Sequence, residues 1–400
     1  MKIDAYFVLV TLSIMVVLSY SFNYISARVK IPSVLLLIGS GIGLKFVADY
    51  FSIRIPSTGT LLEILGIAGL IFIVLEAALD LVIERQKLRL IIRAFVSALG
   101  LLGFTSVLLA TVFSQYFQTS FRLALLHAIP LSVISSAIAI PSVSNMSDDK
   151  REFVIYESTF SDILGIIAFN FLVVQKNSGL HAVGQFSLDI LLIVGISIVS
   201  TVLLIFLLNR STSNVRFFLT FAVLILAYSF AKYLHLPSLI LVLCFGLVLN
   251  NFKSFDYPFV HRFLAMEKLA EATRELRLMT AETAFIIRTF FFLLFGYSID
   301  LTLLESYEVL ALGLGIIVIT IVLRFVFLRF VLHITSAPLM LIAPRGLITV
   351  LLFYSIPAEL RIEKLSEGVL FIVIAFTGLA MTLGLLLNKR SPREKIEDLI

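Results

Sequence analysis

Cysteine and charged residues are scarce in this chain of 400 residues. The single cysteine, Cys244, lies inside an apolar stretch, which excludes an intrachain disulfide and a cysteine-based metal cluster. There is no Walker motif, no GxGxxG after a strand and no HExxH. These absences disfavour ATP-driven transport and membrane metalloprotease chemistry. We therefore expect a protein that is not an enzyme and that holds no resident cofactor or metal.

Hydrophobic residues are abundant, at 60% of the chain, and only 14% of the residues are charged. The mean hydropathy is +1.07. Many apolar runs reach about 20 residues, the length that crosses about 30 Å of hydrocarbon. The runs are continuous rather than alternating, which indicates helices and not a β-barrel. The predicted fold class is an all-α polytopic membrane protein in the lipid bilayer. We interpret the run from about Ala5 as a retained first span.

We predict about thirteen transmembrane helices and one long connector. The helices lie near residues 5–26, 31–50, 61–81, 91–114, 121–144, 153–175, 187–208, 215–233, 236–250, 281–301, 308–332, 335–357 and 366–387. The charged stretch 252–280 is predicted to be a helical cytoplasmic linker, and 388–400 a short cytoplasmic tail. The net charge of +5 does not indicate nucleic-acid binding, because the basic residues lie in short loops between apolar runs.

Two segments recur along the chain in the same order. Residues 31–44 (IPSVLLLIGSGIGL) are similar to 236–249 (LPSLILVLCFGLVL), and residues 71–81 (IFIVLEAALDL) are similar to 291–301 (FFLLFGYSIDL). The equivalents are seven predicted spans apart, so the two halves are predicted to be inverted in the membrane. Inverted repeats are typical of secondary transporters, which bind substrate near the midplane.

The distribution of lysine and arginine predicts the orientation of the chain. Most of these residues lie in the loops after the odd-numbered spans one to eleven and in the tail. Because cytoplasmic loops carry an excess of basic residues, we place the N-terminus outside and the C-terminus in the cytoplasm.

Asp162 is the strongest candidate for an ion-binding residue. It lies deep in an apolar run, and ionisable residues at such positions tend to mark ion pathways. Loss of hydration disfavours a charged carboxylate, which can then hold either a proton or a hard cation in turn. Competition between these two occupants, combined with alternating access, is sufficient for an antiporter. The alternative is a carboxylate that only bonds to a neighbouring helix.

Two predicted spans contain pairs of prolines at matching positions of the halves. Span 121–144 has Pro130 and Pro141 around Ser135-Ser136, and span 335–357 has Pro338 and Pro344. Proline within a span frees backbone carbonyls, and broken, crossing helices of this kind mark transport sites. We expect Ser135 and Ser136 to help coordinate the cation, unless the prolines merely ease packing.

Arg345 cannot lose its proton and therefore needs a carboxylate partner within the membrane. Glu157 is the favoured partner, because it lies about 140° around the helix from Asp162 and so on a different face. We predict a structural ion pair between Glu157 and Arg345. Glu76 is a second possible partner or a cavity-lining acid. Arg288 would either neutralise a core carboxylate or extend towards the cytoplasm.

These segments together resemble the monovalent cation/proton antiporter superfamily over nearly the whole chain. Residues 157–162 (ESTFSD) are similar to the Glu-Ser-x-x-Asn-Asp signature of the sodium/proton branch, with Ser161 in place of asparagine. Residues 344–346 (PRG) resemble the Pro-Arg-Gly of that branch, whose arginine pairs with the signature glutamate. Ser135-Ser136 stands where the sodium branch usually has Thr-Asp and resembles the potassium-efflux branch.

The resemblance implies a homodimer in which a core bundle moves against an interface domain. The implied division is 1–81 for interface helices 1–3, 91–175 for the first half of the ion-binding core, 187–301 for connector helix 7 and interface helices 8–10, 308–387 for the second half of the core, and 388–400 for the tail. Electrogenic members have two adjacent aspartates, so Ser161-Asp162 implies electroneutral exchange.

We therefore expect a Na⁺(or K⁺)/H⁺ antiporter of a bacterial-type inner membrane, with a cation/proton site at Asp162, Ser161, Ser135 and Ser136. One alternative is a sodium-coupled organic-anion transporter of similar shape. Another is a membrane scaffold or sensor that has lost ion exchange.

Overall fold

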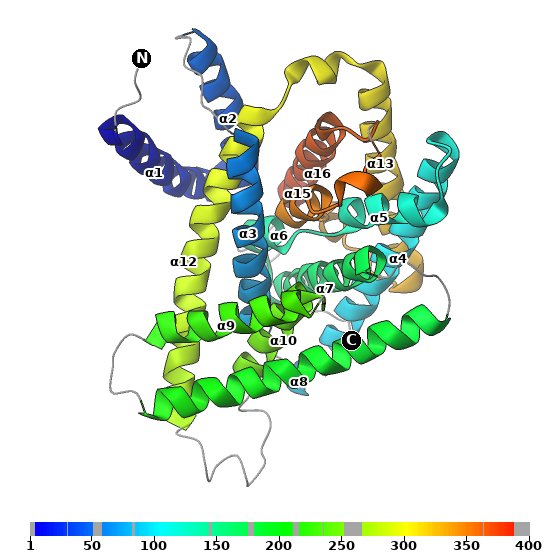
Figure 1. The fold of residues 1–400 in the computed structure, drawn as a ribbon. Helices are drawn as coiled ribbons and strands as arrows, with labels where there is room; N and C mark the ends of the chain where they lie inside the picture. The colour runs from blue at the N-terminus through cyan, green and yellow to red at the C-terminus, as the bar shows by residue number, and fades with distance from the viewer. Residues whose placement is uncertain are drawn as a thin grey trace. The chain divides into compact units, whose positions relative to one another are not determined.

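The protein is built from α-helices, as a computed structural model shows (Figure 1). The structure describes residues 5–29, 31–50, 58–81, 85–143, 146–174, 180–210, 216–234, 236–251, 266–362 and 364–387. No strand occurs within these ranges. The all-α fold class predicted from the apolar runs is confirmed.

A helix or a pair of helices lies at each predicted span. The helices are α1 (Ala5–Val29), α2 (Ser33–Tyr50), α3 (Thr58–Asp80), α4 (Leu88–Tyr116), α5 (Phe121–Ser132), α6 (Ser136–Ser142), α7 (Asp148–Val174), α8 (Leu180–Arg210), α9 (Arg216–Tyr233), α10 (Ser238–Asn251), α12 (Met266–Ser298), α13 (Tyr307–Val326), α14 (Ala337–Leu341), α15 (Leu347–Tyr354) and α16 (Glu367–Leu387). A π-helical turn, Phe327–Val331, extends α13.

Seven stretches within the described residues are long and apolar enough to cross a membrane. They are Ser33–Tyr50, Leu88–Tyr116, Phe121–Ser142, Ser187–Leu204, Thr273–Ser298, Tyr307–Val331 and Glu367–Leu387. Phe218–Tyr233 and Ser238–Asn251 are shorter apolar helices. The number thirteen stays a prediction. Of the predicted linker 252–280, residues 252–265 lie outside the described part, and from Met266 the chain already belongs to α12. The predicted tail 388–400 also lies outside it.

The chain forms two compact units. The first contains Met1–Ile67, Leu88–Gly165 and Ile286–Ile400, and the second contains Ala68–Lys87 and Ile166–Phe285. Within the first unit α4 and α15 pack against α5, and α13 and α14 pack against α16. Within the second unit α8, α9 and α10 pack against one another. The division into core and interface helices stays a prediction.

In the first unit, the repeated segment on α2 crosses α12 with backbone in contact with backbone. A Cβ atom at Gly41 would lie 2.1 Å from the carbonyl oxygen of Leu293, and one at Gly296 would lie 2.2 Å from that of Ile38. Only glycine fits at such a crossing. Four residues after Gly41, Lys45 donates a 2.5 Å hydrogen bond to the Ile299 carbonyl oxygen just beyond the end of α12.

In the second unit, the repeat equivalents of these helices also contact each other. Gly246 of α10 corresponds to Gly41, and a Cβ atom there would lie 2.6 Å from the Ala78 Cβ of α3. Four residues later, Asn250 donates a 3.2 Å hydrogen bond to the Leu81 carbonyl oxygen beyond the end of α3. The sequence repeat is therefore accompanied by a repeated helix contact.

The span 121–144 is divided because the three residues between α5 and α6 are not helical. Val133 ends α5 with φ −68° and ψ 133°, and Ser135 precedes α6 with φ −76° and ψ 114°. The prolines lie inside the two half-helices rather than in the break, since Pro130 belongs to α5 and Pro141 to α6. In the other divided span, Pro338 lies in the first turn of α14, and Pro344 lies in the break itself.

Candidate functional site

The two breaks meet and exchange hydrogen bonds. In a continuous helix the Leu131 carbonyl would accept from the N–H of Ser135. Here the Ser135 N–H donates to the Pro344 carbonyl oxygen at 2.9 Å, and the Leu131 carbonyl accepts from Nε of Arg345 at 2.7 Å. The break at 342–346 thus supplies new partners for both backbone groups that the break between α5 and α6 separates. The positive charge of Arg345 lies at the C-terminal end of α5, where the helix dipole favours a cation.

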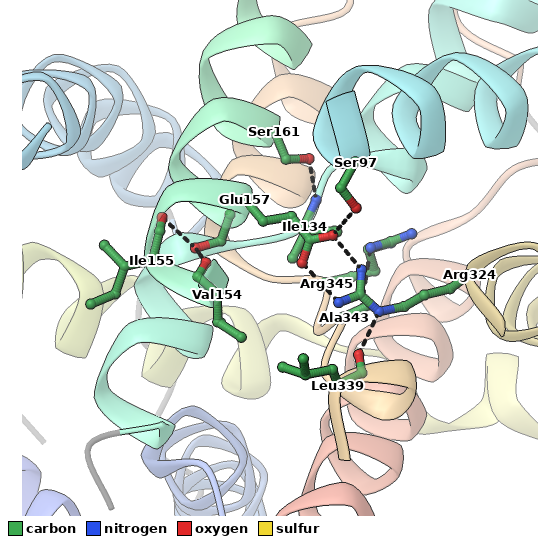
Figure 2. A network of polar contacts seen from close by, with 11 residues as sticks. Ser97, Ile134, Val154, Ile155, Glu157, Ser161, Arg324, Leu339, Ala343 and Arg345 are labelled. Atoms are coloured by element: carbon green, nitrogen blue, oxygen red, sulfur yellow. Dashed lines mark hydrogen bonds and ion pairs between the residues drawn. The ribbon is translucent and has the colours of Figure 1, made fainter. Parts of the chain in front are cut away.

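Helix α7 supplies acceptors for the two amides on either side of Ser135. The Ile134 N–H donates to Ser161 Oγ at 2.9 Å, as Figure 2 shows, and the Ser136 N–H donates to Asp162 Oδ2 at 3.1 Å. Three successive amides of the break are therefore held by three different groups. The extended conformation of the break is maintained by these bonds, because buried backbone groups need partners.

A glycine on α7 lets the break approach this closely. Gly165 lies three residues after Asp162, and a Cβ atom at Gly165 would lie 2.3 Å from Cγ2 of Val133. A larger residue would push the break away from α7. The small residue therefore helps Ser161 and Asp162 reach the backbone.

The structure brings together the four residues predicted to bind the ion. Asp162 and Ser161 are each 1% exposed, Ser135 is fully buried and Ser136 is 6% exposed. Ser135 Oγ has no hydrogen-bond partner within the described residues. A Cβ atom at Gly346 would lie 2.6 Å from this hydroxyl oxygen, so the absent side chain keeps the space beside it open. A carboxylate with nearby hydroxyls offers the oxygen ligands that hard cations prefer.

Glu157 forms a buried, bidentate ion pair with Arg324. Nη1 of Arg324 lies 3.0 Å from Oε1 of Glu157, and Nη2 lies 2.8 Å from Oε2 (Figure 2). Both residues are 1% exposed. Ser97 of α4 donates a 2.5 Å hydrogen bond to the same Oε1, and Nε of Arg324 donates to the Leu339 carbonyl oxygen at 2.9 Å. The pair thus joins α7 to α13, α4 and α14.

The predicted ion pair between Glu157 and Arg345 does not form. Arg345 is buried, at 2% exposed, but its side chain bonds to the carbonyl oxygens of Leu131 and Ala343. Its backbone N–H donates to Thr377 Oγ1 at 3.0 Å. Arg345 is therefore a cap for the broken helix, and Arg324 takes the place at Glu157.

Sequence reasoning missed Arg324 and Ser97. Arg324 lies inside the predicted span 308–332, and an arginine inside a span was a usable signal. It is eight residues from the cytoplasmic end of that span, within reach of the interface for a long side chain. Ser97 gave no signal, because serine is common within membrane helices.

The roles of the two accessory candidates, Glu76 and Arg288, stay predictions. Glu76 is half-buried on the part of α3 that belongs to the second unit. Arg288 is half-buried on the part of α12 that belongs to the first unit. Within the described residues, no group of three or more His, Cys, Asp or Glu side chains could hold a metal ion.

Comparison with known proteins gives the family. Residues 12–389 match a model of the transmembrane sodium/hydrogen exchanger family. A structure of the sodium proton antiporter MjNhaP1 from Methanocaldococcus jannaschii at pH 8 is 18% identical, with a TM-score of 0.63, over 95% of this chain and 95% of that one. A second structure of MjNhaP1 from the same organism, an electron-microscopy map, is 17% identical, with a TM-score of 0.64, over 96% of this chain and 95% of that one.

At these identities the likeness to solved structures shows the fold alone, and the fold is that of a cation/proton antiporter. No curated protein matches the chain at a significant level. The predicted superfamily is confirmed. Because the family model covers nearly the whole chain, the protein belongs to the transmembrane sodium/hydrogen exchanger family, which is a family of multi-pass transporters and not of enzymes.

Proposed function

We propose that this protein exchanges a monovalent cation, Na⁺ or K⁺, for protons by alternating access, and that Asp162 binds the two in turn. One observation carries the proposal. The buried carboxylate of Asp162 lies at the meeting point of two broken helices, where it accepts the N–H of Ser136. In secondary transporters, broken helices at such a point form the sites for substrate and coupling ions.

The chemistry of exchange follows from one carboxylate with two possible occupants. With a cation bound, Asp162 is charged, and the hydroxyls of Ser135 and Ser136 complete the oxygen shell. With a proton bound, the site is neutral and the cation has left. A site of one acid carries one positive charge in each direction, because Ser161 provides no second carboxylate. Exchange is then one-for-one and electroneutral.

The two arginines have separate roles in this proposal. Arg324 neutralises Glu157 and keeps it out of ion binding, since both carboxylate oxygens of Glu157 accept hydrogen bonds from Arg324. Arg345 replaces a helical hydrogen bond at the Leu131 carbonyl and so keeps the break open. Neither arginine changes its charge during transport.

The setting of the site is also part of the proposal. We place the protein in a bacterial-type inner membrane, as a homodimer with its N-terminus outside and its C-terminus in the cytoplasm. The core helices in 91–175 and 308–387 move against the interface helices in 1–81 and 187–301. Basic residues in the predicted cytoplasmic loops support the orientation.

Purified protein in proteoliposomes tests the proposal. A pH-sensitive dye inside the vesicles should report proton movement when Na⁺ or K⁺ is added, and Asp162→Asn should abolish it, because an amide cannot exchange a proton for a cation. Asp149→Asn is the matched control, since Asp149 is an exposed acid in the first turn of the same helix. Full activity in a folded Asp162→Asn variant would exclude Asp162. No proton movement in the wild type with either cation would favour the scaffold or sensor.

A further inference from the structure

His127 is a buried histidine that plays no part in the ion site. It lies on α5, six residues after the helix begins, and is 1% exposed. Its Nδ1 lies 2.9 Å from the Leu123 carbonyl oxygen, and the backbone N–H of Ile362 lies 3.1 Å from its Nε2. Because a carbonyl only accepts and an amide N–H only donates, Nδ1 carries the proton and Nε2 is bare. The contacts therefore require a neutral imidazole.

The contact between His127 and Ile362 joins α5, in the first broken span, to the residues that follow the second broken span. His127 belongs to α5, while Ile362 lies in the segment 355–362 that follows α15. Arg361 folds this segment back onto α15, since its Nε donates to the Ile356 carbonyl oxygen and its Nη2 to that of Tyr354, each at 3.0 Å. Helices α5 and α15 also pack directly together. The hydrogen bond from Ile362 to His127 thus fastens the segment to α5.

Few charged groups surround the imidazole. Arg361, of the segment 355–362, acts on it electrostatically. From α15 and α16 the nearest ionisable groups are Tyr354 and Glu367, which are hydrogen-bonded to each other. Helix α4, which packs along α5, has no ionisable side chain between residues 94 and 115. Within the described residues, the ring of His127 makes hydrogen bonds only with the backbone of Leu123 and Ile362 and with no acid.

Protonation of His127 would therefore oppose the contact that Ile362 makes. A proton on Nε2 turns an acceptor into a donor that faces the N–H of Ile362. It also adds a positive charge near that of Arg361. Since the fastened state needs the unprotonated Nε2, that state is favoured at high pH and is lost as the pH falls.

We propose that His127 and Ile362 form a pH-dependent latch, which holds the segment 355–362 on α5 when His127 is neutral and releases it when His127 is protonated. In the predicted orientation this segment lies on the outer side of the membrane, so the latch responds to external pH. Its role in setting the pH dependence of transport rests on the proposed exchange function. The latch itself does not.

Hydrogen–deuterium exchange of the full-length protein in detergent tests the latch without any transport assay. Peptides covering 355–362 are followed at about pH 8 and about pH 5, on either side of the range in which histidine titrates. Rates are corrected with an unfolded reference. In the wild type we expect protection to fall by about fivefold or more at the lower pH, the factor for one net hydrogen bond.

Two variants separate titration from simple loss of contact. His127→Gln offers a carbonyl oxygen to Ile362 and does not titrate, so protection should stay high at both pH values. His127→Phe keeps an aromatic ring and has no acceptor, so protection should be low at both. The same pH dependence in the wild type and in His127→Gln would overturn the latch, even if His127→Phe fails to fold.

Proteoliposome transport then links the latch to function. The fall in exchange rate or affinity at low external pH should be weaker in His127→Gln than in the wild type. A latch seen by hydrogen exchange in a protein that moves no cations would refute the proposed function and leave the latch standing. Cation transport by a protein that shows no pH-dependent release of the segment would refute the latch and leave the proposed function standing.

Discussion

Replacing Arg324 with methionine should destabilise the protein severely. The change removes the bidentate contact to Glu157, whose two N–O distances are 3.0 and 2.8 Å, and the bond to the Leu339 carbonyl oxygen. Glu157, 1% exposed, would keep only the hydrogen bond from Ser97. Breaking a buried ion pair from one side costs about 3–5 kcal/mol, because it leaves an uncompensated buried charge.

A double-mutant cycle shows how much of this cost belongs to the pair. Glu157→Gln alone leaves Arg324 buried and unpaired, whereas Glu157→Gln with Arg324→Met leaves neither charge. We expect the double variant to be more stable than the sum of the single losses predicts, by a coupling of about 1–3 kcal/mol. Arg329→Met is the control, since Arg329 lies five residues later and is exposed. Its effect should stay within about 0.5 kcal/mol.

Thermal and denaturant unfolding of the purified protein in one detergent measures all four variants. The same cycle with Arg345→Met in place of Arg324→Met tests the pairing that the sequence predicted. The structure requires strong coupling of Glu157 to Arg324 and weak coupling to Arg345. Strong coupling to Arg345, or an Arg324→Met variant that unfolds like the wild type, would refute this reasoning.

Two further predictions concern the serines at the break. Ser136→Asp should raise the apparent affinity for Na⁺ more than for K⁺, because a second negative charge favours the cation with the shorter ion–oxygen distance; equal Na⁺ and K⁺ dependence in proteoliposomes would place Ser136 away from the ion. Gly346→Ala should impair exchange, because its Cβ would meet Ser135 Oγ, while Gly39→Ala has nothing within 4 Å of its Cβ and should not. Cation affinity of the two folded variants checks this, and equal values would show that Ser135 does not bind the ion.

Much of the fold was predictable because membrane insertion is a local property. A helix satisfies all of its backbone hydrogen bonds internally, so each apolar run of sufficient length specifies one without reference to the rest of the chain. The two divided spans were also predictable, since prolines cluster in both. The exact breaks were not, because the amides of residues 134–136 are held by bonds to Ser161, Pro344 and Asp162. Those partners are known only once the helices are packed.

The candidate site divides in the same way. The sequence by itself identified Asp162 and Glu157 as acids within apolar runs, because the cost of burying a charge is a property of the single residue and its neighbours. It paired Glu157 with Arg345 and missed Arg324, which is the partner in the fold. A bidentate pair depends on the direction and distance of two side chains on different helices, which only the packed backbone fixes.

Tertiary structure also gave new roles to residues that the sequence left without one or with the wrong one. Arg345 was predicted to pair with Glu157, whereas in the fold its side chain caps the end of α5 at the Leu131 carbonyl oxygen. His127 had no assigned role, and in the fold its Nε2 accepts from the N–H of Ile362, 235 positions along the chain. Hydropathy is a sum over neighbouring residues and can be read along the sequence. A hydrogen bond is directional and short, so its partner is decided by where the folded chain returns.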